Sequence, residues 1–193
     1  MAVVPSIKAT GFQSAADDLA KLVAAGRLTR RQLEKRLEPG DLVYLDKQLA
    51  ASSWVPIETY ARVLDLLTEL EGGGDVGAYL RGRGKRAGAR LHKLGLYGQF
   101  EANIETWGVK VGAITATMGA VLYNFTKWSF EADPEAGAFE TTLSEAPNYP
   151  DALRLVGEGF IEYLAENLLP DHKVEVTSER VAADKIVFRG RYS

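Results

Sequence analysis

The sequence predicts an α+β fold in which N-terminal helices pack on a C-terminal four-stranded antiparallel sheet. Two observations predict it. Through about residues 13–123, apolar residues recur every three or four positions, as in helices with one buried face. From about residue 124 onward, over residues 124–193, the period falls to two, and strand-like segments lie on either side of one further helix. Four strands covered by helices bury an apolar face that a lone hairpin could not. We therefore expect a single α+β domain over residues 1–193.

Capping residues mark the starts of the expected helices in the first part. Side chains that accept hydrogen bonds from free backbone amides, or a proline that lacks such an amide, are typical of helix N-termini. In chain order these signals are Ser14 with Asp17, Thr29 with Gln32, Asp41, Pro56 and Asp75. A sixth helix carries an apolar stripe of Ile104, Trp107, Val111, Ile114, Met118, Leu122 and Phe125.

The second part reads strand-strand-helix-strand-strand. The segment WSFEAD alternates apolar and polar residues, a turn follows at residues 133–137, and FETTL returns as a strand. Asp151 begins a helix that ends before Pro170. KVEVTSE and KIVFRGRY are the two last strands, and we expect either KIVFRGRY or WSFEAD to form an exposed edge of the sheet.

The stretch Tyr79–Gly98, YLRGRGKRAGARLHKLGLYG, is rich in glycine. On a helix, Gly84 lies on the same face as Leu80 and Leu91, and Gly88 borders that face. The next helix has a similar small face at Gly108, Gly112 and Gly119. Glycine inside a helix costs about 1 kcal/mol relative to alanine, so it needs a compensating contact. We expect the two small faces to pack on each other; close approach of a ligand is the alternative.

The same stretch carries a row of basic residues. Arg83, Arg86, Arg90 and Lys93 fall roughly along one side of the helix, and we interpret them as an exposed contact for an anion or a partner. The alternative is a solvated face paired with acids such as Glu69, Glu71 and Asp75. GRGKRAG matches neither the dinucleotide-binding glycine pattern nor the P-loop.

Aromatic and apolar residues gather near the expected junction of helices and sheet. They are candidates for the lining of a ligand pocket, or else simply for core packing. These residues are Tyr97, Phe100, Trp107, Met118, Tyr123 and Trp128.

Several kinds of chemistry are missing from the sequence. Without cysteine there is no thiolate metal site, disulfide or cysteine nucleophile. His92 and His172 have no companion at a metal-binding or catalytic spacing, and pairs such as Glu158 and Glu162 fit exposed helix faces. We therefore expect no catalytic residue and no metal site. A net charge of -3 argues against nucleic acid as a partner.

Nothing in the sequence indicates a membrane segment. The N-terminus lacks the pattern of a signal peptide, and the most apolar segment, GVKVGAITATMGAVLYNF, is too polar to span a bilayer. We expect a cytoplasmic protein.

The order of segments resembles the superfamily of 4-vinyl reductase domains, haem-nitric-oxide-binding-like domains and TRAPP-type trafficking subunits. The resemblance lies in WSFEADPEAGAFETTL, YPDALRLVGEGFIEYLAENL and KVEVTSERVAADKIVFRGRY, and less strongly in YLRGRGKRAGARL. WVPIETYARVLDLLTEL is similar to a segment of a related myxobacterial-type family. The resemblance implies a small-molecule sensor or a dimerising adaptor, and a homodimer. The chain lacks the cysteines of the vinyl reductases and the Tyr-x-Ser-x-Arg motif of the haem proteins. We therefore expect no cofactor, with His92 as the histidine to consider for haem.

Three functions follow from these observations. We favour a non-catalytic regulatory module that binds a small hydrophobic ligand, a protein partner or both. One alternative is an enzyme acting on a hydrophobic or tetrapyrrole-like substrate, which would need titratable groups in the pocket. The other is a nucleotide or nucleic-acid binder that uses the basic helix at 80–94.

Overall fold

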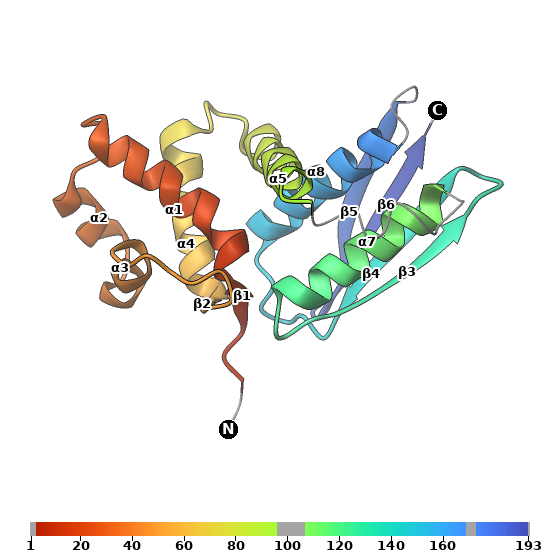
Figure 1. Ribbon diagram of the computed structural model, residues 1–193, viewed down its shortest axis with the longest axis horizontal. Helices are drawn as coiled ribbons and strands as arrows, with labels where there is room; N and C mark the ends of the chain where they lie inside the picture. Colours follow the sequence, from red (N-terminus) through yellow and green to blue (C-terminus); the bar gives the residue numbers. More distant parts are fainter. Residues whose placement is uncertain (1–2, 96–106, 169–172, 193) are drawn as a thin grey trace.

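The computed structural model describes residues 3–95, 107–168 and 173–192, and it confirms the predicted α+β architecture (Figure 1). The helical part contains β1 (Ser6–Lys8), α1 (Ala9–Ala24), α2 (Arg30–Arg36), α3 (Pro39–Leu45), β2 (Trp54–Pro56), α4 (Ile57–Glu71), α5 (Val76–Lys93) and α7 (Trp107–Leu122). The sheet part contains β3 (Lys127–Asp133), β4 (Ala138–Ser144), α8 (Asp151–Leu168), β5 (Val174–Ala182) and β6 (Lys185–Tyr192).

The sheet has the strand order β3-β4-β6-β5, and every neighbouring pair is antiparallel. Helices α7 and α8 cover one face of it (Figure 1). Cross-strand partners Thr141 and Phe188 lie on that covered face and are fully buried. On the opposite face, Arg189 pairs with Glu140 at 3.0 Å. The alternation of buried and exposed residues is therefore the period of two seen in the sequence.

The prediction for the sheet edge is partly wrong. KIVFRGRY forms β6, which lies between β4 and β5 and is not an edge. WSFEAD forms β3, which is an edge, and β5 is the other. Three consecutive residues of β6, Ile186–Phe188, are buried, so this central strand departs locally from the alternation of buried and exposed residues.

Two short strands tie the first helices together, and the sequence analysis missed both. β1 pairs with β2, and Ile7 of β1 also forms an isolated bridge with Tyr123, just after α7. With β1 in place, α1 begins at Ala9, five residues before the predicted Ser14. Each strand is only three residues long, too short to show a period of two.

Of the other capping signals, Thr29 and Asp75 mark helix starts as predicted, whereas Pro56 and Asp41 are displaced from their predicted positions. Thr29 and Gln32 form a full capping box, and the Asp75 carboxylate accepts from the amide of Ala78 at 2.8 Å. Pro56 precedes α4 rather than beginning it. Asp41 lies inside the first turn of α3, where its buried carboxylate accepts hydrogen bonds from Thr59 and Arg62.

The glycine faces pack closely, but not on each other. Gly84 of α5 meets the backbone of α8 at Val156 and Phe160, and Gly159 of α8 meets the backbone of α5 at Arg81. This contact is between helices, as predicted, yet its second helix is α8 rather than α7. α7 uses its glycines against the sheet instead.

Candidate ligand cavity

An apolar cavity of about 80 Å³ lies where the helical part meets the sheet part. It is bounded by β1 and α1, by α4 and α5, by α7, and by β3 and α8. Small residues leave the space: Gly11 of α1, Ala87 of α5 and Gly157 of α8 all line it. Leu91, Met118 and Phe160 add large apolar side chains to its wall. The cavity is therefore built by elements that are distant in sequence.

Three tyrosines give the cavity a polar side. Tyr60 of α4, Tyr123 after α7 and Tyr149 before α8 all line it, and the Tyr149 hydroxyl donates to that of Tyr123 at 3.2 Å. The Tyr60 side chain is 6% exposed, and its hydroxyl forms no hydrogen bond with any other described residue. Burial raises the pKa of all three hydroxyls above the usual value of a tyrosine. All three are neutral near pH 7, and because Tyr149 already donates to Tyr123, the hydroxyls of Tyr60 and Tyr123 are the ones available as donors.

The floor of the cavity is held by aromatic packing. Trp128 stacks on Tyr123 with ring centroids 6.2 Å apart, and on Phe188 with centroids 6.0 Å apart. On its other side Trp128 fills the space that a side chain at Gly119 would need. Because α7 has glycine there, it can lie close to β3 while the indole remains in contact with both.

The structure brings together three of the six residues predicted to line a pocket. Met118, Tyr123 and Trp128 line the cavity. Trp107, at the start of α7, instead packs against Phe139 at 5.4 Å and Tyr192 at 4.9 Å between ring centroids. Tyr97 and Phe100 lie outside the described residues.

The predicted basic row divides into one buried and three exposed residues. The expectation that Arg83 is exposed is wrong: its side chain is 5% exposed and donates to Asp18 at 2.9 Å and to the Tyr79 hydroxyl at 3.2 Å. It lies next to Gly84 on the face that α5 turns inward. Arg86, Arg90 and Lys93 are exposed, and Arg90 also reaches the cavity. The anion contact itself stays a prediction for these three.

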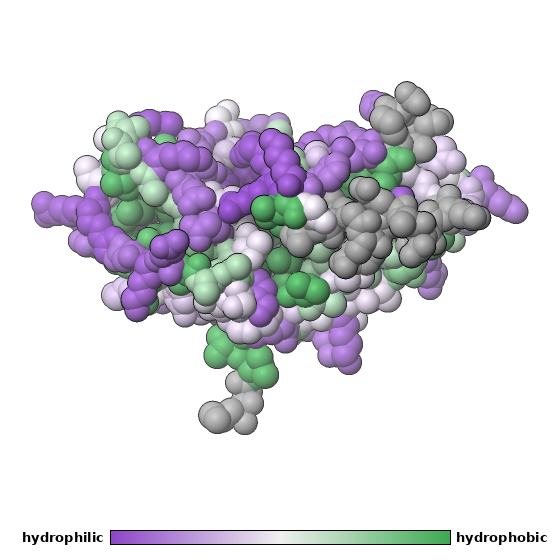
Figure 2. Space-filling model, in the orientation of Figure 1, coloured by the Kyte–Doolittle hydropathy of each residue, from purple (hydrophilic) through white to green (hydrophobic). Residues whose placement is uncertain are grey.

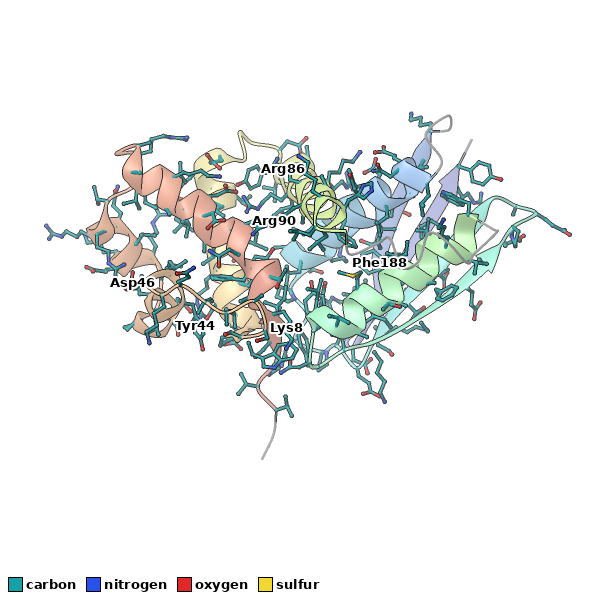
Figure 3. All side chains as sticks on the ribbon, viewed as in Figure 1. Lys8, Tyr44, Asp46, Arg86, Arg90 and Phe188 are labelled. Atoms are coloured by element: carbon teal, nitrogen blue, oxygen red, sulfur yellow. The ribbon has the colours of Figure 1, made fainter. Side chains whose placement is uncertain are left out.

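Figure 2 shows hydrophilic residues over the α5 region near the centre of the visible face, with hydrophobic residues just below them. Figure 3 labels Arg86 and Arg90 in the same region. The polar surface of α5 and the apolar interior thus meet at Arg90, whose guanidinium lies 3.8 Å from the carboxylate of Asp17. This separation is at the long end of an ion pair, and both side chains remain partly exposed.

Sequence reasoning missed the contributions of Tyr60, Tyr149 and Arg90 to the cavity. Tyr60 belongs to the apolar stripe of α4, where an aromatic residue is ordinary core. Tyr149 lies in the loop before α8 and had no periodic pattern around it. Only the tertiary arrangement shows that these residues converge.

His92 does not reach the cavity. Its Nδ1 atom lies 3.2 Å from the Tyr163 hydroxyl on an exposed part of α5 and α8. His172 lies outside the described residues. Among the residues that the structure describes, no group of three histidine or acidic side chains is placed to hold a metal ion.

No protein-family model matches the sequence, and no curated protein matches it. Solved structures do resemble the fold. An H-NOX point mutant from T. tengcongensis superposes with a TM-score of 0.61 at 11% identity, covering 97% of this chain and 98% of that one. An Fe(II) unliganded H-NOX mutant from K. algicida gives 0.60 at 11% identity, covering 97% of each chain. An oxygen-binding H-NOX domain related to soluble guanylate cyclases gives 0.57 at 10% identity, covering 96% and 92%.

These similarities show that the chain has an H-NOX-like fold. They agree with the haem-nitric-oxide-binding branch of the resemblance found in the sequence. They do not support the 4-vinyl reductase or TRAPP-type names.

The residues present do not fit the haem that this fold family implies. Pockets for drug-sized molecules measure roughly 300–1,000 Å³, and a porphyrin is at least that large, whereas this cavity measures about 80 Å³. The cavity wall described by the structure contains no histidine to bind iron. The space between α7 and the sheet is filled by Phe130 against Gly112 and by Trp128 against Gly119. The chain thus combines an H-NOX-like fold with a cavity that is too small for a porphyrin.

In the described part of the chain, no helix is both long enough and apolar enough to cross a bilayer.

Proposed function

We propose that this protein is a non-catalytic regulatory module that binds a small, mainly apolar ligand in the cavity between its helical and sheet parts. One observation carries the proposal: an apolar cavity is lined by the buried Tyr60 and Tyr149 and the partly buried Tyr123, and the hydroxyl of Tyr60 has no hydrogen-bond partner among the described residues. This hydroxyl is not fully enclosed by protein atoms, so a ligand in the cavity can reach it. A ligand with a carbonyl or similar acceptor would supply the missing hydrogen bond, which typically contributes about 0.5–1.5 kcal/mol.

The chemistry of the lining favours binding over catalysis. A general base near neutral pH is usually a histidine, a carboxylate or a lysine. The described lining contains none of these, and Arg90 is its one charged residue. The tyrosines are held neutral by burial, which suits them to donate hydrogen bonds rather than to accept protons.

The position of the cavity suits regulation. A ligand there touches α1 and α4 from the helical part as well as β3 and α8 from the sheet part. A ligand shifts a conformational equilibrium only if it interacts differently with the two states. A ligand between the helical part and the sheet part meets this condition if those two parts move relative to each other. A protein partner that contacts both parts could then respond to the altered arrangement.

The test is binding of a small carbonyl compound, with the three-carbon ketone acetone as the probe, to three forms of the purified chain. The wild type should show chemical-shift changes in protein NMR at the tyrosines of the cavity. Ala87→Leu should lose them, since the added carbons fill the space. Ala120→Leu, a matched change at an exposed position of α7, should bind as the wild type does. Unaltered binding to Ala87→Leu would show that the cavity is not the site.

A further inference from the structure

We infer that the ligand of this cavity is a short amphipathic anion, whose apolar body lies among the tyrosines and whose anionic head is held by Arg86, Arg90 and Lys93. This inference rests on the proposed function, because it specifies the class of ligand that the same cavity takes. It does not follow from the H-NOX-like fold, whose haem the cavity does not fit.

The two halves of such a site share one residue. Arg90 lines the apolar cavity, and it also lines a shallow surface hollow of about 410 Å³ formed with Arg86, Ala89, Lys93 and Leu94. These residues lie at spacings of three and four on α5, so they face the same side of the helix. Arg90 therefore joins the cavity to the basic hollow, and a ligand beside it can contact both.

The described residues leave most of the charge in the hollow without an ion-pair partner. Among the described residues, neither Arg86 nor Lys93 forms an ion pair, and Arg90 has only the Asp17 carboxylate at 3.8 Å. By contrast, the other basic residues of α5 before Ala87 are all engaged: Arg81 with Glu158, Arg83 with Asp18, and Lys85 with Glu162 and Glu166. Within the described part of the chain, the basic residues of α5 that form no ion pair therefore lie toward its C-terminal end, beside Arg90, which lines the cavity. Guanidinium groups bind carboxylate or phosphate through paired hydrogen bonds. A carboxylate or a phosphate therefore suits the basic hollow.

The size of the cavity limits the body of the ligand. A water molecule takes about 30 Å³ of liquid, and a methylene group is of similar size, so 80 Å³ encloses roughly three carbon atoms. The head remains outside in the hollow. Butanoate and propyl phosphate both satisfy this description, and they differ only in the head.

The experiment compares four probes by NMR titration of the full chain: butanoate, propyl phosphate, neutral butanamide, and acetate, which has a head without a body. It uses the wild type, the variant Arg86→Gln/Arg90→Gln/Lys93→Gln, and a control that removes the same charge elsewhere, Arg31→Gln/Lys35→Gln/Lys47→Gln. The control residues are exposed on or near α2 and α3 and form no ion pair among the described residues.

We expect butanoate or propyl phosphate to bind the wild type at least about tenfold more tightly than butanamide and acetate. Whichever of the two binds better identifies the head as carboxylate or phosphate. The α5 variant should reduce their affinity to that of butanamide, and the control variant should not. If butanamide binds as tightly as butanoate, the anionic head is wrong while the cavity remains a site. If acetate equals butanoate, the body does not enter the cavity and the inference fails. If no probe binds, this inference fails, and the separate titration with the neutral ketone decides the proposed function.

Discussion

The guanidinium of Arg83 lies inside the protein, where it joins α5 to α1 through Asp18. Replacing it in Arg83→Gln removes a buried hydrogen bond between charged groups, which typically contributes about 1.5–3 kcal/mol. The free energy of unfolding in urea should fall by that amount. Arg86→Gln, at an exposed position without an ion pair among the described residues, should change it by less than about 0.5 kcal/mol. Equal stability of the two variants would contradict the buried pairing.

Removing the hydroxyl of Thr141 should increase the stability of the protein rather than decrease it. Thr141 is fully buried on the helix-covered face of β4, and its Oγ1 atom has no hydrogen-bond partner among the described residues. Thr141→Val keeps the shape and removes the unpaired polar atom, so it should raise the free energy of unfolding by about 1 kcal/mol. Thr115→Val should instead lower it, because the Thr115 hydroxyl donates to the carbonyl of Val111 at 2.8 Å. Thermal unfolding of the two variants would check the contrast, and a destabilised Thr141→Val would contradict it.

Sequence patterns predict which residues are apolar and buried, but not which polar residues join them. Glu158 was interpreted as part of an exposed helix face, yet it is 2% exposed and bonded to Arg81, Arg154 and Ser178. These partners come from a different helix, from its own helix and from β5. A buried charge is tolerated when such partners surround it, and their convergence depends on tertiary contacts that periodicity does not carry.

Helix α5 contains glycines that pack against another helix and glycines that do not, and alanine substitutions should affect the two differently. A Cβ atom at Gly84 would overlap the backbone of α8 at Val156 and Phe160, while at Gly82 it would meet only the end of the Arg86 side chain at 3.6 Å. Gly84→Ala should therefore destabilise the protein by about 1–3 kcal/mol through overpacking. Gly82→Ala should stabilise it by up to about 1 kcal/mol, since alanine is the better helix former. Urea unfolding measures both, and similar effects at the two positions would refute the close α5–α8 contact.

The starts of most helices could be predicted because capping is a local interaction, as at Thr29 with Gln32. The partners of the helices could not. Glycine at positions 84 and 112 indicates that another element packs closely against the helix. The sequence does not say whether that element is a helix or a strand, because either can pack against glycine. Gly112 meets Phe130 of β3, not another helix. The strands β1 and β2 also escaped prediction, since pairing across more than forty residues supplies their stability rather than their own sequence.

At the scale of the whole molecule, β3 and β5 form the two edges of the sheet, and no other described strand pairs with their outer sides. An edge strand presents unpaired backbone groups that a second chain can cover. We therefore expect a homodimer, with a mass in light scattering of about twice the 21.1 kDa of one chain. The mass should rise toward that value with concentration. A mass of one chain at every concentration would exclude this assembly.

The cavity should also couple the two parts of the fold. Its wall comes from α1 and α4 on one side and from β3 and α8 on the other, so a ligand within it must contact both. At one hundred times its dissociation constant, a ligand that binds only the folded state adds about 2.7 kcal/mol to the free energy of unfolding. We expect butanoate or propyl phosphate, whichever binds more tightly, to slow hydrogen exchange of backbone amides in α1 and in α8 together. Ala87→Leu should show no such protection at the same concentration, whereas Ala120→Leu should show it fully. Protection confined to α8 and the sheet would mean that the ligand lies on one part alone, and that the helical part does not sense it.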